Sequence, residues 1–232
     1  MALEDRKMMA PPWRGGWAGE DDSRILAHGD FAVALWQPDG QPQYTRQWLE
    51  QAVSSGERKA YCLFWGHRPA RDGRITRSCL SQWWPADFYA GSRSYLCMEQ
   101  YMMAGKAELF GDQEMLERIL ASSDPKQIKA LGRQVRGFDQ TVWDQFKYAI
   151  VLNGNWCKFN QNGELGDFLL STGDSALAEA SPYDRVWGIG LPADSADAKA
   201  PVKWQGQNLL GFALMEVRDE LRRAAGNEQL CD

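Results

Sequence analysis

The chain has 232 residues, 44% hydrophobic and 12% aromatic, enough for one domain to bury a sizeable core. A charged fraction of 25%, a net charge of -5 and no long apolar run disfavour a membrane span and broad binding to nucleic-acid duplexes. Five cysteines without a CxxC pair and only two histidines disfavour a disulfide framework and a metal centre. We therefore expect a cytoplasmic protein that uses no metal or other cofactor.

The first 59 residues are interpreted as an N-terminal extension. Acidic residues, prolines and glycines interrupt any apolar run in residues 1–22, so no signal peptide is expected. A strand is predicted within Arg24–Trp36 and a short helix within Gln43–Ser54, from a β-like apolar run and from helical apolar spacing.

The main domain is expected over residues 60–225, followed by a tail at 226–232. It opens with a predicted strand over Ala60–Trp65, which Gly66 ends. From Tyr95 onward the pattern is helical, so the predicted class is α+β, predominantly helical, with a few short strands.

Capping residues mark several of the helices. Asp124 and Pro125 begin a helix that is predicted to reach Val135, and Asp139 caps the next one. Gly173 is placed to end a further helix, and a final helix is expected from about Asn208 to Arg223.

The segment from Tyr95 to Phe110 carries the first candidate site. On a helix, Glu99 and Lys106 fall on one apolar stripe within ~60° of each other, with Ala104, Glu108 and Asp112 on the opposite side. Two interpretations remain open. In the first, Lys106 reaches solvent and Glu99 bonds a neighbouring backbone group. In the second, a desolvated lysine serves as nucleophile or Schiff-base former, and the carboxylate moves protons or steadies a developing cation.

A second candidate cluster lies at Asp184, Trp187 and Gly188. A carboxylate beside a tryptophan and two glycines suits a ligand cleft, although core packing is the more usual reason for such a tryptophan. The chain contains no Walker A sequence and no GxGxxG, which disfavours ATP hydrolysis and a Rossmann dinucleotide site.

Ordered motifs from residue 60 to residue 223 resemble the NADAR (YbiA-like) family. They are Phe64-Trp65-Gly66, Leu80-Ser81-Gln82-Trp83, Met98–Ala107 with Phe110-Gly111-Asp112, Leu131–Val135, Trp143, Lys158-Phe159, Leu169–Asp174, Glu179-Ala180-Ser181, Asp184, Trp187–Gly190 and Gly206–Gly211.

The resemblance implies a metal-free N-glycosidase that acts on a ribose joined to a guanine-like ring. The expected partner is a small-molecule nucleotide or ADP-ribosylated guanine in nucleic acid. Lys106 is implied as the Schiff-base lysine, with Glu99 and Asp184 as the other catalytic residues. The residues expected to bind substrate are Trp65, Ser81, Arg133, Trp143, Trp187, Gly188 and Asn208.

Three positions depart from the family pattern. Gln100 stands where a histidine is usual, Gln82 where an asparagine is usual, and Trp65 where tyrosine is frequent. Removal of ADP-ribose from ADP-ribosylated guanine is the leading expectation. One alternative is an N-glycosidase of ribosylamino-pyrimidine phosphates in riboflavin synthesis. The other is a non-catalytic sensor of ADP-ribose or NAD, which stays open because Gln100 lacks the titratable group of the usual histidine.

Overall fold

The structure is a computed structural model that describes residues 42–228, with side chains to residue 225. The strand expected within Arg24–Trp36 lies outside the described residues. The described chain forms two compact units. Unit 1 is Pro85–Asn162, and unit 2 combines Pro42–Trp84 with the segment from Gly163 onward.

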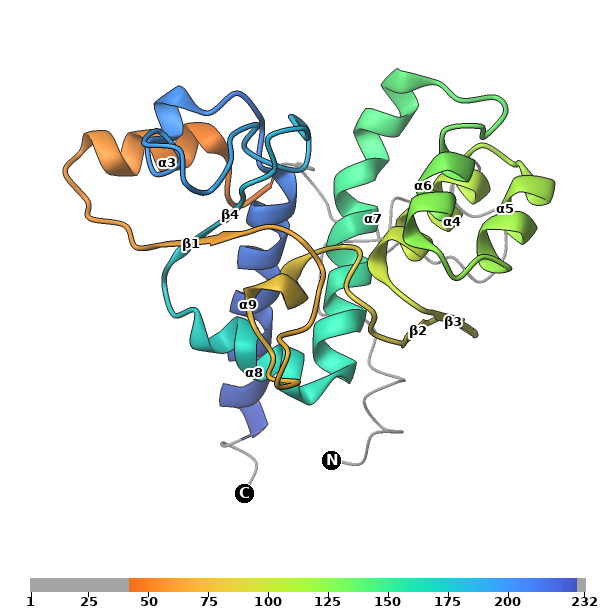
Figure 1. Cartoon of the computed structure of the whole chain (residues 1–232), viewed down its shortest axis with the longest axis horizontal. Coiled ribbons are helices and arrows are strands. Elements are labelled where there is room, and N and C mark those ends of the chain that lie inside the picture. The colour runs from red at the N-terminus through yellow and green to blue at the C-terminus, as the bar shows by residue number, and fades with distance from the viewer. Residues whose placement is uncertain (1–41, 229–232) are drawn as a thin grey trace. The chain divides into compact units, whose positions relative to one another are not determined.

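Unit 1 is a helical cluster with one small hairpin. Its elements are β2 (Phe88–Ala90), β3 (Arg93–Tyr95), α4 (Met98–Leu109), α5 (Gln113–Leu120), α6 (Pro125–Gly132) and α7 (Gln140–Gln161). Strands β2 and β3 pair antiparallel. Helix α4 lies at the centre, because α5, α6 and α7 all pack against it (Figure 1).

The central position of α4 corrects the two-faced helix expected from the sequence. Ala104, Glu108 and Asp112, predicted to lie on the opposite side, are as deeply buried as the apolar stripe. With three helices packed around it, α4 has no broad solvent face, and Lys106 is one of its least buried residues.

The helical pattern was also expected to begin too early. Tyr95 ends β3 and pairs with Phe88 across the hairpin, so α4 starts only at Met98. The Tyr95 ring contacts the rings of Phe88 and Tyr101, which also contact each other, so Tyr95 is part of an aromatic cluster.

The predicted helix caps are confirmed. The Asp124 carboxylate accepts a hydrogen bond from the Lys126 amide at the start of α6, although α6 ends at Gly132 rather than Val135. The Asp139 carboxylate accepts hydrogen bonds from the Thr141 and Val142 amides at the start of α7. These caps satisfy amide groups that have no partner within the helix.

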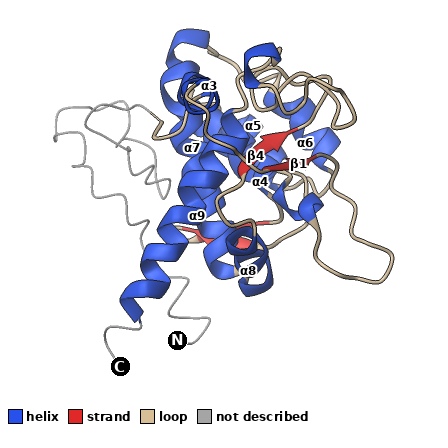
Figure 2. Ribbon diagram, turned by 90° about the vertical axis from the view of Figure 1, so that its left-hand side faces the viewer, coloured by secondary structure: helices blue, strands red, loops and turns tan. Residues whose placement is uncertain are grey.

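Unit 2 contains a two-stranded parallel sheet with helices packed on it. Its elements are α3 (Arg46–Ser54), β1 (Tyr61–Phe64), η1 (Arg77–Leu80), α8 (Gly163–Ser171), β4 (Ala176–Glu179), η2 (Pro201–Lys203) and α9 (Leu209–Glu228). Strand β4, which the sequence pattern did not reveal, pairs with β1 from Tyr61↔Ala176 to Phe64↔Glu179 (Figure 2).

Helix α9 approaches β4 closely where it begins. A Cβ atom added to Gly211 would lie 2.1 Å from the Leu177 carbonyl oxygen, so only glycine permits this approach. The helix expected to end near Arg223 continues to Glu228, and Gly173, with φ of 55°, follows α8 as predicted.

The α+β, predominantly helical class is confirmed by these elements. None of the helices between residues 42 and 228 is long and apolar enough to cross a bilayer.

Candidate functional site

The amine of Lys106 lies in a half-buried, partly aromatic environment in unit 1. Its Nζ donates a hydrogen bond to the Gly132 carbonyl at 2.9 Å. The same Nζ lies 4.0 Å from the ring centroid of Phe138 and 5.7 Å from that of Trp143. Neither interpretation of the helix pattern foresaw this arrangement, in which the end of α6 and the start of α7 surround the amine.

Burial lowers the pKa of the Lys106 amine from its ordinary value. The ammonium form loses hydration in this environment, and the aromatic faces and one carbonyl replace only part of it. A lower pKa increases the fraction of neutral amine near neutral pH, which is the form that attacks an electrophilic carbon.

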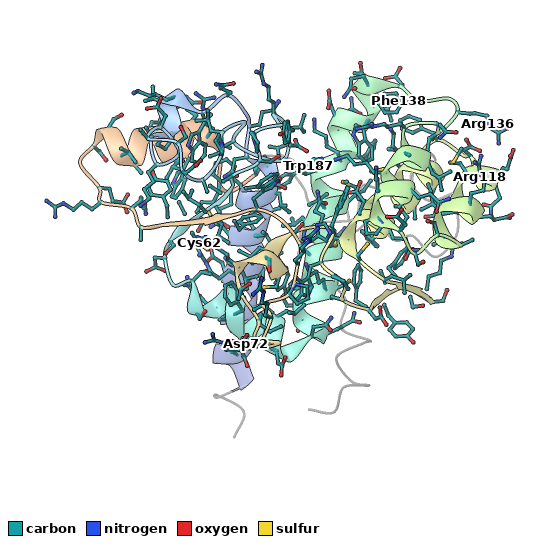
Figure 3. The ribbon with its side chains drawn as sticks, viewed as in Figure 1. Cys62, Asp72, Arg118, Arg136, Phe138 and Trp187 are labelled. Atoms are coloured by element: carbon teal, nitrogen blue, oxygen red, sulfur yellow. The ribbon has the colours of Figure 1, made fainter. Side chains whose placement is uncertain are left out.

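The sequence did not single out Phe138, although its ring is the nearest to the amine. Phe138 lies in the connection between α6 and α7, with Arg136 two residues before it (Figure 3). Gly137 between them has φ of 70°, a conformation that suits glycine, and the Phe138 ring contacts the Phe110 ring at 5.3 Å. A Gly-Phe pair before a capping aspartate was the only sequence signal.

An ion pair holds this connection in place. The Arg136 amide donates to Asp112 Oδ2 at 2.8 Å, and the Arg136 guanidinium donates to both oxygens of the same carboxylate, with Nη2 to Oδ1 at 2.5 Å. Arg136 keeps the pKa of the Asp112 carboxyl well below its usual range. Asp112 also caps α5 through the Met115 amide, so one carboxylate joins α5 to the connection that carries Phe138.

Two predicted substrate-binding residues belong to the segments that surround the amine. Arg133 follows Gly132, whose carbonyl accepts the Lys106 hydrogen bond, and its side chain is exposed. Trp143 is half-buried in the first turn of α7. Trp143 and Phe138 therefore lie near the amine itself, whereas Arg133 is next to it only through the backbone of Gly132.

Glu99 lies in the first turn of α4 and is 1% exposed. The positive end of the helix dipole favours a carboxylate at this place. Lys158, on α7, is also buried, and the sequence assigned it no role. Burial raises the pKa of the Cys97 thiol, the Glu99 charge raises it further and the Lys158 charge opposes them, so both charges lie near Cys97.

The departure at Gln100 has a structural explanation. Its side-chain amide donates to the carbonyls of Ile119, Leu120 and Ser122 and accepts from the Leu96 amide. The side chain thus satisfies carbonyl groups at the end of α5 that have no partner within the helix. In this chain, Gln100 joins α5 to the start of α4.

Unit 2 holds the other predicted site residues. Trp65 follows β1 and is exposed, whereas Ser81 is buried and its Oγ accepts a hydrogen bond from the Trp83 amide. Asp184 Oδ1 accepts from the Val186 and Trp187 amides at 2.9 Å and 2.7 Å. This carboxylate therefore shapes the turn before Trp187, and both of these bonds end on the same oxygen.

Trp187 and Gly188 pack tightly in unit 2. Trp187, labelled in Figure 3, is 8% exposed, and a Cβ atom at Gly188 would lie 2.7 Å from the Glu179 carbonyl oxygen. Asn208 has no exposed surface and φ of 58°, and its side chain bonds the Glu179 amide and the Leu177 carbonyl. These two bonds of Asn208 hold β4 against the start of α9, and substrate binding by all three residues stays a prediction.

Within residues 42–228, no group of three or more His, Cys, Asp and Glu side chains is arranged to hold a metal ion.

The candidate site residues fall into two groups. Unit 1 holds an amine, two aromatic rings and an exposed guanidinium, and unit 2 holds an exposed tryptophan and a turn shaped by a carboxylate. A primary amine with a lowered pKa can attack an electrophilic carbon such as C1′ of a ribose.

Comparison with known proteins identifies the family. The NADAR domain matches residues 63–222, more than half of the chain. The chain belongs to the NADAR family. The N-glycosidase R617 of Acanthamoeba polyphaga mimivirus is 48% identical over 146 residues, which cover 61% of this chain and 86% of that protein.

Two further comparisons bear on fold and function. The riboflavin biosynthesis protein VVA0006 of Vibrio vulnificus is 30% identical over 146 residues, 63% of this chain and 36% of that protein. The NMR structure of the Escherichia coli protein YbiA aligns with a TM-score of 0.57 at 23% identity, over 72% of this chain and 88% of that one. The YbiA likeness supports the fold.

Proposed function

We propose that this NADAR protein removes ADP-ribose from ADP-ribosylated guanine, with Lys106 as the covalent nucleophile. The observation that carries the proposal is the environment of the Lys106 amine, half-buried on the Gly132 carbonyl and beside the rings of Phe138 and Trp143. Burial lowers the pKa of the amine, which favours the neutral, nucleophilic form.

The chain is a hydrolase of N-glycosyl bonds. It belongs to the NADAR family, and the mimivirus relative, of which the alignment covers 86%, is named an N-glycosidase. The guanine-linked substrate and the lysine mechanism are the parts that we add.

In the proposed reaction, the Lys106 lone pair forms a bond to ribose C1′. The bond between C1′ and the guanine nitrogen breaks, its electron pair stays on the nitrogen, and that nitrogen takes up a proton. Loss of the amine proton and opening of the ribose ring give an imine between Nζ and C1′. Addition of water to this imine releases ADP-ribose and restores the free amine, so atoms and charge balance over the two steps.

We assign Glu99 to the charge and proton changes at C1′. Glu99 lies seven residues before Lys106 on α4, about 10.5 Å along the helix axis. The two side chains are therefore too far apart along the helix to pair directly, and in the proposed reaction the sugar lies between them. A buried carboxylate stabilises developing positive charge more strongly than a hydrated one.

Arg133 and Trp143 supply the binding chemistry beside the amine. The exposed Arg133 guanidinium suits the pyrophosphate of ADP-ribose, because guanidinium groups form paired hydrogen bonds with phosphate oxygens. The Trp143 ring offers an apolar face to a sugar or a base.

The test is covalent trapping. The wild type is incubated with ADP-ribosylated guanosine and borohydride, and the protein mass is measured. With borohydride, we expect a covalent adduct on Lys106. Without borohydride, we expect turnover that releases guanosine. Both should be lost in Lys106→Ala. Lys126→Ala, which removes an exposed lysine of α6, is the matched control and should trap and turn over like the wild type. Full turnover by Lys106→Ala would exclude the lysine mechanism.

A second candidate is an N-glycosidase acting on ribosylamino-pyrimidine phosphates. The likeness to the Vibrio vulnificus riboflavin biosynthesis protein favours it, although the alignment covers only 36% of that protein. Incubation of the enzyme with each substrate in turn, followed by product masses, separates the two candidates. Release of ribose 5-phosphate from the pyrimidine compound alone would favour the second.

A further inference from the structure

Two aromatic rings in unit 2 are far more exposed than the aromatic residues of its core. Tyr183 is 85% exposed and Trp65 is 55% exposed, yet their ring centroids lie only 6.3 Å apart with an interplanar angle of 54°. The rings thus form an open pair. Large aromatic faces left in solvent are unfavourable for folding, and clustered ones mark places where another molecule binds.

The pair is built on the ends of the two parallel strands. Trp65 comes directly after β1, and Tyr183 lies four residues after β4. The last residues of these strands, Phe64 and Glu179, are register partners, and the Ala180 amide bonds the Phe64 carbonyl at 2.8 Å. Both aromatic residues therefore lie in the connections that follow the carboxyl ends of the two strands. In α/β proteins, ligands bind at the carboxyl ends of parallel strands.

Local hydrogen bonds hold each ring in its position. The Ser181 hydroxyl accepts from the amides of Tyr183 and Asp184 at 3.3 Å and 3.2 Å, which fixes the turn that presents Tyr183. Gly66, with φ of 79°, turns the chain immediately after Trp65. The exposed rings are thus carried by ordered backbone on both sides.

We propose that Trp65 and Tyr183 form a stacking subsite for the adenine of ADP-ribose, the base that the enzyme does not cleave. This inference rests on the proposed function. Cleavage at C1′ favours a site from which water is excluded, whereas this pair lies in solvent, so it suits a base that is bound without being cleaved. Aromatic stacking accepts a base through its flat face and needs no contact with its edges.

The subsite assigns a role to Tyr183, which the sequence motifs left without one, and limits that of Trp65. Trp65 would bind the ADP-ribose part of the substrate rather than the guanine. Loss of either ring should therefore weaken recognition of substrates that carry adenosine, and should do so through KM more than through kcat.

The test compares two substrates that share the same scissile bond. One is ADP-ribosylated guanosine, and the other is the same compound after a phosphodiesterase has cut its pyrophosphate and removed AMP. For Trp65→Ala and Tyr183→Ala, we expect the ratio of kcat/KM between the full and the trimmed substrate to fall roughly 5- to 100-fold. Tyr183→Phe keeps the ring and should keep the wild-type ratio.

Tyr89→Ala is the matched control, because Tyr89 is an exposed aromatic residue of unit 1 outside the proposed site. Its ratio should equal that of the wild type. An equal loss on both substrates in Trp65→Ala or Tyr183→Ala, or no loss on either, would overturn the adenine subsite.

A binding measurement separates this inference from the proposed function. Calorimetric titration with ADP-ribose and with ribose 5-phosphate requires no turnover. Suppose that the wild type cleaves neither the full nor the trimmed substrate, but that Tyr183→Ala binds ADP-ribose more weakly than the wild type while Tyr183→Phe binds it equally well. The subsite then stands and the proposed activity fails. If the wild type cleaves ADP-ribosylated guanosine and Tyr183→Ala binds ADP-ribose unchanged, the subsite alone fails.

Discussion

Two buried carboxylates on α4 differ in their surroundings. Glu108 forms an ion pair with Arg93 of β3, whereas Glu99 lies in the first turn of the helix near the Cys97 thiol. Both residues are buried, so both contribute to packing. Only Glu99 is assigned to the reaction, which makes Glu108 an internal reference.

Replacing Glu99 by Gln removes the negative charge and nearly preserves the shape of the side chain. We expect kcat to fall about 10²-fold or more, because the proposed positive charge at C1′ loses its stabilising carboxylate. Glu108→Gln should reduce thermal stability with a much smaller effect on kcat. Steady-state kinetics and thermal unfolding of both variants decide the matter, and equal losses of kcat would assign Glu99 to the structure alone.

The Asp112–Arg136 pair makes stability depend on acid pH. Since Arg136 depresses the pKa of the folded Asp112 carboxyl, the pair stabilises the folded protein above the unfolded pKa of about 3.9, and this contribution is lost as pH falls through the lower folded pKa. Urea unfolding at pH 7 and at successively lower pH should show a smaller acid-induced loss in Arg136→Met than in the wild type. Arg118→Met, on exposed α5 surface, is the control. Equal acid sensitivity of Arg136→Met and the wild type would contradict this account.

At the residue scale, the sequence could place Lys106 among apolar neighbours but not its actual contacts. Helical spacing indicated the stripe, whereas Gly132 and Phe138 come from the end of α6 and from an irregular connection. Periodicity carries no information about such connections. For the same reason, the role of Gln100 at the end of α5 was not visible from its own helix.

At the element scale, the sequence predicted features that depend on neighbouring residues, but it did not predict features that depend on pairing with distant segments. Asp124 and Asp139 cap their helices as predicted, because a cap depends on residues two or three positions away. Strand β4 was not predicted, because the four-residue segment Ala176–Glu179 becomes a strand only through pairing with β1, which is far away in the sequence. The burial of α4 on all sides likewise depends on three other helices.

The approach of α9 to β4 gives a prediction at this scale. In Gly211→Ala, the new Cβ would lie 2.1 Å from the Leu177 carbonyl oxygen and 2.6 Å from the Asn208 side-chain amide. Backbone must move to accommodate it, so we expect the free energy of unfolding to fall by about 1–3 kcal/mol. Gly163→Ala, at the start of α8, meets no atom within 4 Å and is the control. Urea denaturation measures both, and similar stabilities for the two variants would contradict the close approach.

At the scale of the whole molecule, the sequence motifs predicted the α+β class and the family, while the grouping of site residues follows the two units. Glu99, Lys106, Arg133 and Trp143 belong to unit 1, whereas Asp184, Trp187 and Gly188 belong to unit 2. The shared cleft expected for these residues stays a prediction. The division at residues 1–59, 60–225 and 226–232 also stays one.

The parallel pairing of β1 with β4 bears on the order of folding. Register partners Tyr61 and Ala176 are 115 positions apart in the chain, whereas α4 to α7 form from one continuous segment. Closing so long a loop is entropically slow, so contacts within unit 1 should form first. Pulsed hydrogen exchange during refolding should protect α4 and α7 amides before those of β1, and simultaneous protection would contradict this order.

During synthesis, the same separation leaves β1 without its partner strand. At about 5–20 residues per second, β4 follows β1 from the ribosome only after on the order of ten seconds. Throughout that interval the apolar strand Tyr61–Phe64 has a free edge, which is the kind of segment that pairs wrongly with other chains. The yield of this protein in cells should therefore depend on chaperones that bind nascent chains, and should not follow from the stability of the folded protein alone.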